Sequence, residues 1–291
     1  MAVLAAAAVT LVGGPLAAAV HDTGAFELDG NAVNGPAAGD DWDNVCHEVL
    51  GTDCSTCPTR TTSCTASPRG TRRQWARCCF FGSDRYDNSG DAQQGFWFFQ
   101  NEIGLGTNNI GGGFGFTGVH RAGDLLVISN FSNGGTTSTI TVYSWDPTCT
   151  RTTGSAAGTC GDANLRILAT SNNANCASAT ANDAFCGIVN PANGTTAPWP
   201  FTDKSGNNTY LQGELYEGGV NLTALGLGDR CFASVAAESR SSTSTTATLK
   251  DFTLGTFGGC RSSVTTQSSI TGQTSIGTGS VSVFDSATGT R

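Results

Sequence analysis

The chain is 291 residues long, only 13% of these residues are charged, and the formal net charge at pH 7 is −8. This balance argues against a nucleic-acid partner, because phosphate binding needs a clustered positive field. The length allows one large β-sandwich or two ordinary domains, and either would bury enough surface to fold without a metal.

The chain begins with an apolar stretch, MAVLAAAAVTLVGGPLAAA (1–19), that ends in small residues. This pattern predicts a signal peptide of the bacterial type, cleaved near Ala19, and the lack of a positively charged start indicates missing upstream residues. Gly13, Gly14 and Pro15 interrupt a run that would need about 20 apolar residues to span a bilayer. We therefore expect a secreted or cell-surface protein whose mature domain does not insert into the membrane.

The segment 46–79 is predicted to be an irregular loop rich in cysteine and arginine. Between residues 54 and 79 it holds five arginines, five cysteines and hardly any strand pattern. Two interpretations stay open: a flexible loop tied by disulfides, or an error in the sequence, since charge balance and patterning both differ from the flanks.

Short apolar or alternating runs follow, and helical spacing of apolar residues is nearly absent. These runs predict strands at 95–100, 124–131, 139–145, 165–169, 210–217, 231–240 and 246–257, with one short helical turn at 221–225. The runs 124–131 and 139–145 are predicted to form a β-hairpin, because a Gly-Gly turn signal separates them. Residues 20–260 are therefore expected to form one all-β domain, an antiparallel β-sandwich of the jelly-roll kind.

Twelve cysteines in an exported chain favour disulfides over metal sites or free thiols. Six lie within 46–79 and six between residues 149 and 260, so each group can pair internally. In the second group, pairing of sequence neighbours would stabilise the fold by about 3 kcal/mol per bridge. The pairs expected on this basis, with other connectivities left open, are Cys149 with Cys160, Cys176 with Cys186 and Cys231 with Cys260.

Several strings carry a resemblance to one family: HDTGAFELDGNA (21–32), DDWDNV (40–45), FGSDRYDNSGDAQQGFWFFQN (81–101), GDLLVISNFSNGG (123–135), GELYEGGVNLTALG (213–226) and ESRSSTSTTATLKDFTLGTF (238–257). The chain resembles a family of large secreted or cell-surface bacterial proteins with no established activity. The resemblance implies a domain similar to concanavalin A-like and laminin-G-like jelly rolls, ahead of immunoglobulin-like or prealbumin-like modules. Residues 261–291, rich in Ser, Thr and Gly, are accordingly interpreted as a linker or the start of such a module. The segment 46–79 departs from the family pattern, because relatives carry a longer stretch containing Asp and Lys.

A dense group of polar residues precedes the aromatic run at 95–100, and it contains Asp84, Asp87, Asn88 and Asp91. Carboxylate and amide oxygens are the ligands that Ca²⁺ prefers, so a calcium site is one interpretation. The other is a turn in which Asp and Asn side chains bond their own backbone and need no metal.

Glu217, Glu238 and Arg240 alternate with apolar residues, which predicts that they are partly buried. Two carboxylates roughly 5–9 Å apart could hydrolyse a glycosidic bond, so Glu217 and Glu238 are a candidate catalytic pair. The favoured alternative is a Glu–Arg ion pair, because buried charges require partners. No residue set in the sequence identifies an enzyme.

Aromatic residues concentrate at 96–99, where alternation predicts that Phe96 and Phe98 face one side of a sheet and Trp97 and Phe99 the other. An exposed Trp97 would suit stacking on sugar rings, and Arg85 and Arg240 are further candidate binding residues. The first hypothesis is a non-catalytic binding or adhesion module that recognises carbohydrate or another surface polymer. The alternatives are a purely structural surface-array module and a glycoside-active enzyme.

Overall fold

The protein was analysed as a computed structural model, which describes residues 5–9, 20, 28–33, 41, 78–89, 92–106, 115–132, 137–172, 174–178, 184–197, 199–228, 230–256, 263–268 and 285–290. Within these residues, regular structure consists of β-strands and one 3-10 turn, η2 (Cys176–Ser178). The described ranges contain no helix with the length and hydropathy to cross a bilayer. The prediction of an all-β fold is confirmed.

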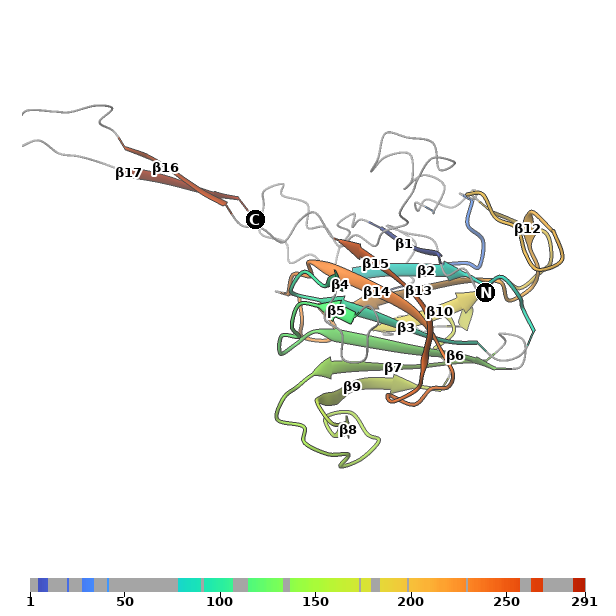
Figure 1. Cartoon of the computed structure of the whole chain (residues 1–291), viewed down its shortest axis with the longest axis horizontal. Helices are drawn as coiled ribbons and strands as arrows, with labels where there is room; N and C mark the ends of the chain where they lie inside the picture. Colours follow the sequence, from blue (N-terminus) through green and yellow to red (C-terminus); the bar gives the residue numbers. More distant parts are fainter. Residues whose placement is uncertain are drawn as a thin grey trace, which may run out of the picture.

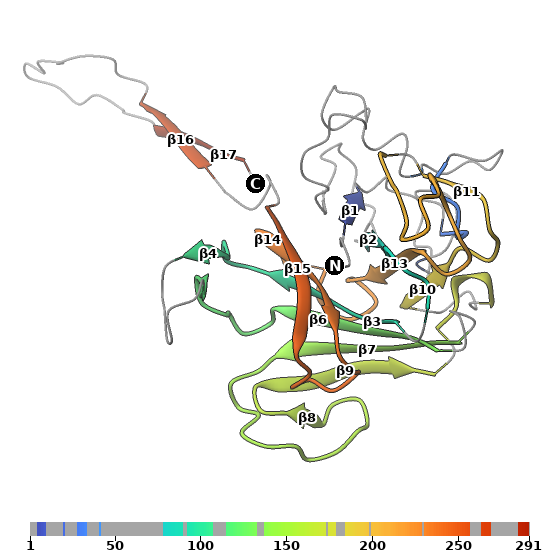
Figure 2. The same cartoon turned by 45° about the vertical axis from the view of Figure 1, so that its right-hand side comes forward.

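The larger of two main sheets has seven strands, and all its pairs are antiparallel. Figures 1 and 2 show β6, β7 and β9 lying side by side in this sheet. In spatial order the strands are β15 (Leu249–Thr256), β14 (Ser234–Arg240), β3 (Ala92–Phe99), β6 (Leu125–Ser132), β7 (Thr137–Trp145), β9 (Leu165–Ser171) and β8 (Cys160–Asp162). The hairpin predicted from 124–131 and 139–145 is the β6–β7 pair.

The smaller sheet has four antiparallel strands, and three two-stranded ribbons complete the described structure. Its strands are, in order, β1 (Ala5–Val9), β2 (Cys78–Asp84), β13 (Leu215–Asn221) and β10 (Phe185–Val189). The ribbons pair β4 (Gly104–Gly106) with β5 (Gly115–Thr117), β11 (Thr195–Thr196) with β12 (Thr209–Tyr210), and β16 (Ser263–Ser268) with β17 (Asp285–Thr290). The β16–β17 ribbon projects away from the two sheets (Figure 1).

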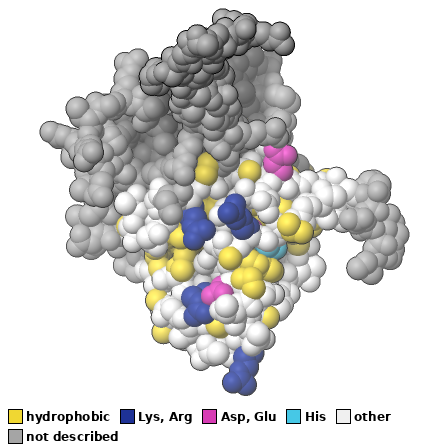
Figure 3. Space-filling view, turned by 90° about the vertical axis from the view of Figure 1, so that its left-hand side faces the viewer, with side chains coloured by type: hydrophobic (Ala, Val, Ile, Leu, Met, Phe, Trp, Pro, Cys, Tyr) yellow, Lys and Arg dark blue, Asp and Glu magenta, His cyan; other side chains and the backbone are white. Residues whose placement is uncertain are grey.

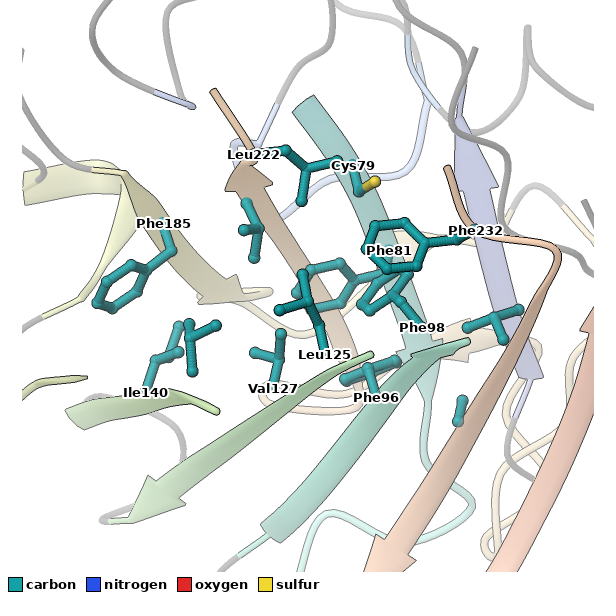
Figure 4. Close-up of a cluster of buried hydrophobic side chains, with 14 of the residues drawn as sticks. Cys79, Phe81, Phe96, Phe98, Leu125, Val127, Ile140, Phe185, Leu222 and Phe232 are labelled. Atoms are coloured by element: carbon teal, nitrogen blue, oxygen red, sulfur yellow. The ribbon is translucent and has the colours of Figure 1, made fainter. Parts of the chain in front are cut away.

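The main hydrophobic core lies between the two sheets. Phe96 and Phe98 of β3 point into it and meet Phe81 of β2, whose ring centroid is 4.5 Å from that of Phe96 (Figure 4). Trp97 and Phe99 lie on the opposite face of β3, as the alternation predicts. The chain is therefore an antiparallel β-sandwich.

The outward face of the smaller sheet is covered by a second apolar cluster. Phe80 and Leu215 of this sheet pack against Val20, Leu28 and Trp199, which lie outside it. As a result β13 is buried along its whole length, on both faces.

Among the local features that differ from the sequence prediction, three concern the strands of the smaller sheet. The strand predicted at 210–217 is divided, because β12 ends at Tyr210 and β13 starts at Leu215. β10 was not predicted, and β2 begins at Cys78, inside the segment predicted to be an irregular loop. Strands buried on both faces carry continuous apolar runs and lack the alternation on which the prediction relied.

Two of the three predicted disulfides are present: Cys149–Cys160 and Cys176–Cys186. Cys231 is also disulfide-bonded, but its predicted partner Cys260 lies outside the described residues. The helical turn predicted at 221–225 is a hydrogen-bonded turn in which the Leu225 N–H donates to the Asn221 carbonyl at 3.2 Å.

Candidate binding surface

The outward face of the seven-stranded sheet carries a row of aromatic and aliphatic side chains. Strand register places Trp97 of β3 beside Leu126 of β6, and Leu126 beside Tyr143 of β7. Trp97, Tyr143 and Trp145 are half-buried and pack on a buried cluster that includes Leu126. Directly opposite residues of adjacent strands share a face, so this row runs across the middle of the sheet.

Four rings meet at one end of this face, and we call Trp97, Phe99, His120 and Trp145 the aromatic cluster. The His120 ring stacks on Trp145 with the centroids 3.9 Å apart and an angle of 9° between the planes. Trp97 and Phe99 are also nearly parallel, with centroids 5.6 Å apart, and His120 lies 4.7 Å from Trp97. Figure 3 shows hydrophobic side chains gathered around the histidine at this end of the molecule.

His120 is held in place by the buried carboxylate of Asp124. The His120 Nδ1 atom lies 3.1 Å from Asp124 Oδ2, which also accepts from the Arg121 N–H at 2.9 Å. Asp124 Oδ1 accepts from the backbone N–H and the side-chain amide of Gln100. Burial opposes ionisation of Asp124, but these hydrogen bonds, led by that of His120, outweigh it and hold the pKa of the carboxyl below its usual value.

Glu238 and Arg240 lie on the same outward face and form a buried ion pair. Glu238 stands directly opposite Gly95 of β3, where an added Cβ would come 2.6 Å from the Glu238 carboxylate. The Arg240 guanidinium contacts Glu238 and donates to the carbonyls of Ser244 and Thr245. Burial raises the pKa of Glu238, and Arg240 offsets part of that effect. The favoured interpretation, a Glu–Arg ion pair, is confirmed for these two residues.

Glu217 lies on the other side of the sandwich from Glu238. It shares the outward face of the smaller sheet with Leu215, and its Oε2 accepts a hydrogen bond of 2.7 Å from the Gly30 N–H. The main core and both sheets separate the two carboxylates, and stacked sheets alone are about 10 Å apart. The structure therefore does not bring Glu217 and Glu238 together as a catalytic pair, because residues on the outward faces of two sheets cannot meet across them.

The predicted calcium ligands make other contacts. Asp84 is buried and accepts hydrogen bonds from Trp199 Nε1 at 2.7 Å and the Tyr210 hydroxyl at 3.3 Å. Asp87 accepts from the Ser89 N–H at 2.9 Å, the self-bonded turn that was the alternative interpretation.

Lys204 also contacts Asp87, with its Nζ 2.6 Å from Oδ2, and Asn88 donates to the Gln212 carbonyl at 3.1 Å. Asp91 lies outside the described residues, and the described part of the chain holds no cluster of three His, Cys, Asp or Glu side chains suited to a metal. Calcium binding stays a prediction.

Of the three predicted binding residues, two share a face. Trp97 and Arg240 lie on the outward side of the seven-stranded sheet, whereas Arg85 follows β2 and donates to the Ser89 carbonyl at 3.0 Å. His120 and Asp124 were not predicted as site residues. Their only sequence signal was the register of the predicted hairpin, which brings Trp145 next to the residues that precede β6.

Comparison of the chain with protein-family models, with curated proteins and with solved structures returned no match.

Proposed function

We propose that this chain is a non-catalytic, secreted or cell-surface binding module whose ligand is a carbohydrate or related surface polymer. The observation that carries the proposal is the aromatic cluster, in which Trp97 and Trp145 are only partly buried on an outward sheet face. A tryptophan with one side packed and another accessible offers a flat apolar surface that can stack on the C–H face of a sugar ring.

Neutral hydrogen-bonding groups beside the aromatic row support the choice of carbohydrate. Gln93, Asn130 and Thr139 lie in register across β3, β6 and β7, on the same face as Trp97. Gln93 donates to the Asn130 side chain at 3.1 Å, and all three residues are half-buried. Amides and hydroxyls without charge match sugar hydroxyls, and they do not match the phosphates of nucleic acids.

The disulfides support the proposed extracellular location, and the path of the chain between the sheets supports the proposed fold. The bonds Cys149–Cys160 and Cys176–Cys186 are compatible with an extracellular protein, because disulfides persist in oxidising compartments. Within the sandwich class we propose a jelly roll of the concanavalin A or laminin-G kind. The chain passes between the sheets from β2 to β3, from β9 to β10 and from β13 to β14, and such crossings are compatible with that topology.

The proposal is tested by measuring binding to a panel of soluble and insoluble polysaccharides with and without Ca²⁺. We expect Trp97→Ala and Trp145→Ala each to weaken binding about tenfold, equivalent to about 1.4 kcal/mol, because a stacking surface is lost. Tyr86→Ala is the matched control, since Tyr86 is an exposed aromatic that follows β2 and lies outside the aromatic cluster.

The tryptophan variants must keep the melting temperature of the parent chain, so that a loss of affinity does not reflect unfolding. If both tryptophan variants bind like the parent chain, the aromatic cluster is not the binding surface. If the parent binds no polysaccharide in the panel, the structural-module alternative takes its place. The glycosidase alternative would need a second carboxylate close to Glu238, which Glu217 does not supply.

A further inference from the structure

The outer edge of the smaller sheet is covered by a strand from the N-terminal apolar stretch. β1 pairs antiparallel with β2 over five residues, from Ala5 opposite Asp84 to Val9 opposite Phe80. The other edge of β2 pairs with β13 over its whole length. The residues of β2 from Cys79 to Asp84 are buried. Cys79 and Phe81 belong to the main core, and Phe80 belongs to the second apolar cluster.

Without β1, no other strand of the described residues would cover the outer edge of β2. Edge strands normally carry charges, bulges or a covering segment that prevent pairing with other chains. β15, at one edge of the larger sheet, has Lys250 and Asp251 in its sequence, and its pairing with β14 is bulged. β2 reads CCFFGSD, and its single charge, Asp84, is held by Trp199 and Tyr210.

The opposite edge of the same sheet is protected by covalent means. β10 is contacted by the segment around Asn175, and the Gly187 N–H donates to the Ala174 carbonyl at 2.8 Å. The Cys176–Cys186 disulfide ties this segment to the strand. Among the described sheet edges, β2 alone is thus covered by residues that the sequence predicts to be removed.

We propose that residues 5–9 mask a strand-pairing site, and that cleavage after Ala19 allows β2 to pair antiparallel with β2 of a second copy of this chain. A pairing of identical strands across a two-fold axis is self-complementary, so one exposed edge is enough to form a closed dimer. Centred on Phe81, it places Asp84 opposite Cys78 and Ser83 opposite Cys79, so no like charges face each other. The product is a continuous six-stranded sheet.

The cleaved chain keeps what it needs to fold. Every residue of the three buried clusters lies between Val20 and Ala237, and both described disulfides lie in that range. Loss of β1 therefore removes backbone hydrogen bonds at one edge and leaves the clusters intact.

The test starts from the full chain, folded and oxidised, with a recognition sequence for a specific protease inserted after Ala19. Analytical ultracentrifugation before and after cleavage should show the mass rising from that of a monomer to twice that value. Synthetic peptide 1–19, added in excess, should return the cleaved chain to the monomer. Amides of β2 should stay protected from hydrogen exchange in the dimer.

A second variant tests the mask without cleavage. Successive N–H groups of a strand point to opposite sides, so Ala6→Pro with Ala7→Pro removes at least one donor from the β1–β2 pairing. This uncut variant should dimerise, whereas Ala17→Pro with Ala18→Pro, outside β1, should stay monomeric.

A cleaved chain with native circular dichroism that remains monomeric at its highest soluble concentration would overturn the proposal. So would a dimer that the peptide does not dissociate, because another surface would then hold it. Binding of a foreign extended peptide in place of the second copy would equally contradict it.

Discussion

Asp124 is a fully buried carboxylate whose two oxygens are both occupied. Four hydrogen bonds reach it, from the backbone and side chain of Gln100, from the Arg121 N–H and from His120. A buried charge is tolerated when its hydrogen-bonding capacity is met, and here the partners also set the angle of the His120 ring against Trp145. The buried Asp124 carboxylate thus helps to orient the His120 ring within the aromatic cluster.

We expect Asp124→Asn to lower the free energy of unfolding at neutral pH by about 1–3 kcal/mol, because the amide cannot accept all these hydrogen bonds. The pKa of Asp124 is below its usual value in the folded state, so the stabilisation is present above the ordinary carboxyl pKa. It is lost as the pH falls through the lowered pKa. Urea unfolding at several pH values should therefore show the two chains converging in acid, and Asp29→Asn, at an exposed position, is the control.

The Glu238–Arg240 ion pair leads to a second prediction about the free energy of unfolding. Glu238→Ala should cost about 3 kcal/mol, because it leaves the Arg240 guanidinium buried beside an empty site. The double variant Glu238→Ala with Arg240→Met should recover part of the loss but not all, since Arg240 also donates to two carbonyls of the following turn. A double-mutant cycle by chemical denaturation measures the coupling, and simple additivity of the two positions would contradict it.

At the scale of elements, the two described disulfides connect different kinds of segment. Cys149–Cys160 closes the loop that leads into β8, while Cys176–Cys186 fastens a covering segment to the edge strand β10. The bonds close loops of similar length, 11 and 10 residues apart. Their contributions to stability should accordingly be alike, although their local effects should not.

Removal of either bond by paired alanine substitution should lower the free energy of unfolding by about 3 kcal/mol. Only Cys176→Ala with Cys186→Ala should accelerate hydrogen exchange of the Gly187 amide, which donates to the Ala174 carbonyl. Equal protection of Gly187 in both variants would show that the disulfide is not needed to keep the segment on β10.

The alternation of apolar and polar residues identified strands that have one partly solvent-exposed face and missed strands that are buried on both faces. It correctly placed Phe96 and Phe98 inward and Trp97 outward, because Gln93 and Trp97 on the outer side of β3 are only partly buried. β2 and β10 lack that signal, since both of their faces are buried. The aromatic cluster was only partly predictable, because Trp97 and Trp145 meet through strand pairing between distant parts of the chain.

At the scale of the whole molecule, the outward faces of the two sheets are unlike. The smaller sheet is sealed by Val20, Leu28 and Trp199, and its Glu217 is enclosed there. The larger sheet keeps half-exposed rings and neutral polar side chains on its outer face. Sequence patterns alone could not separate these cases, because Glu217 and Glu238 each alternate with apolar residues along a strand.

The edge pairing of β2 has a consequence for how the chain would meet a repetitive polymer. Directly opposite residues of paired strands share a face, so two copies joined through β2 would turn both aromatic clusters toward the same side. Two weak contacts made by one rigid body on a single polysaccharide layer reinforce each other through effective concentration. Removal of residues 1–19 would thereby convert a weak, reversible ligand contact into avid attachment.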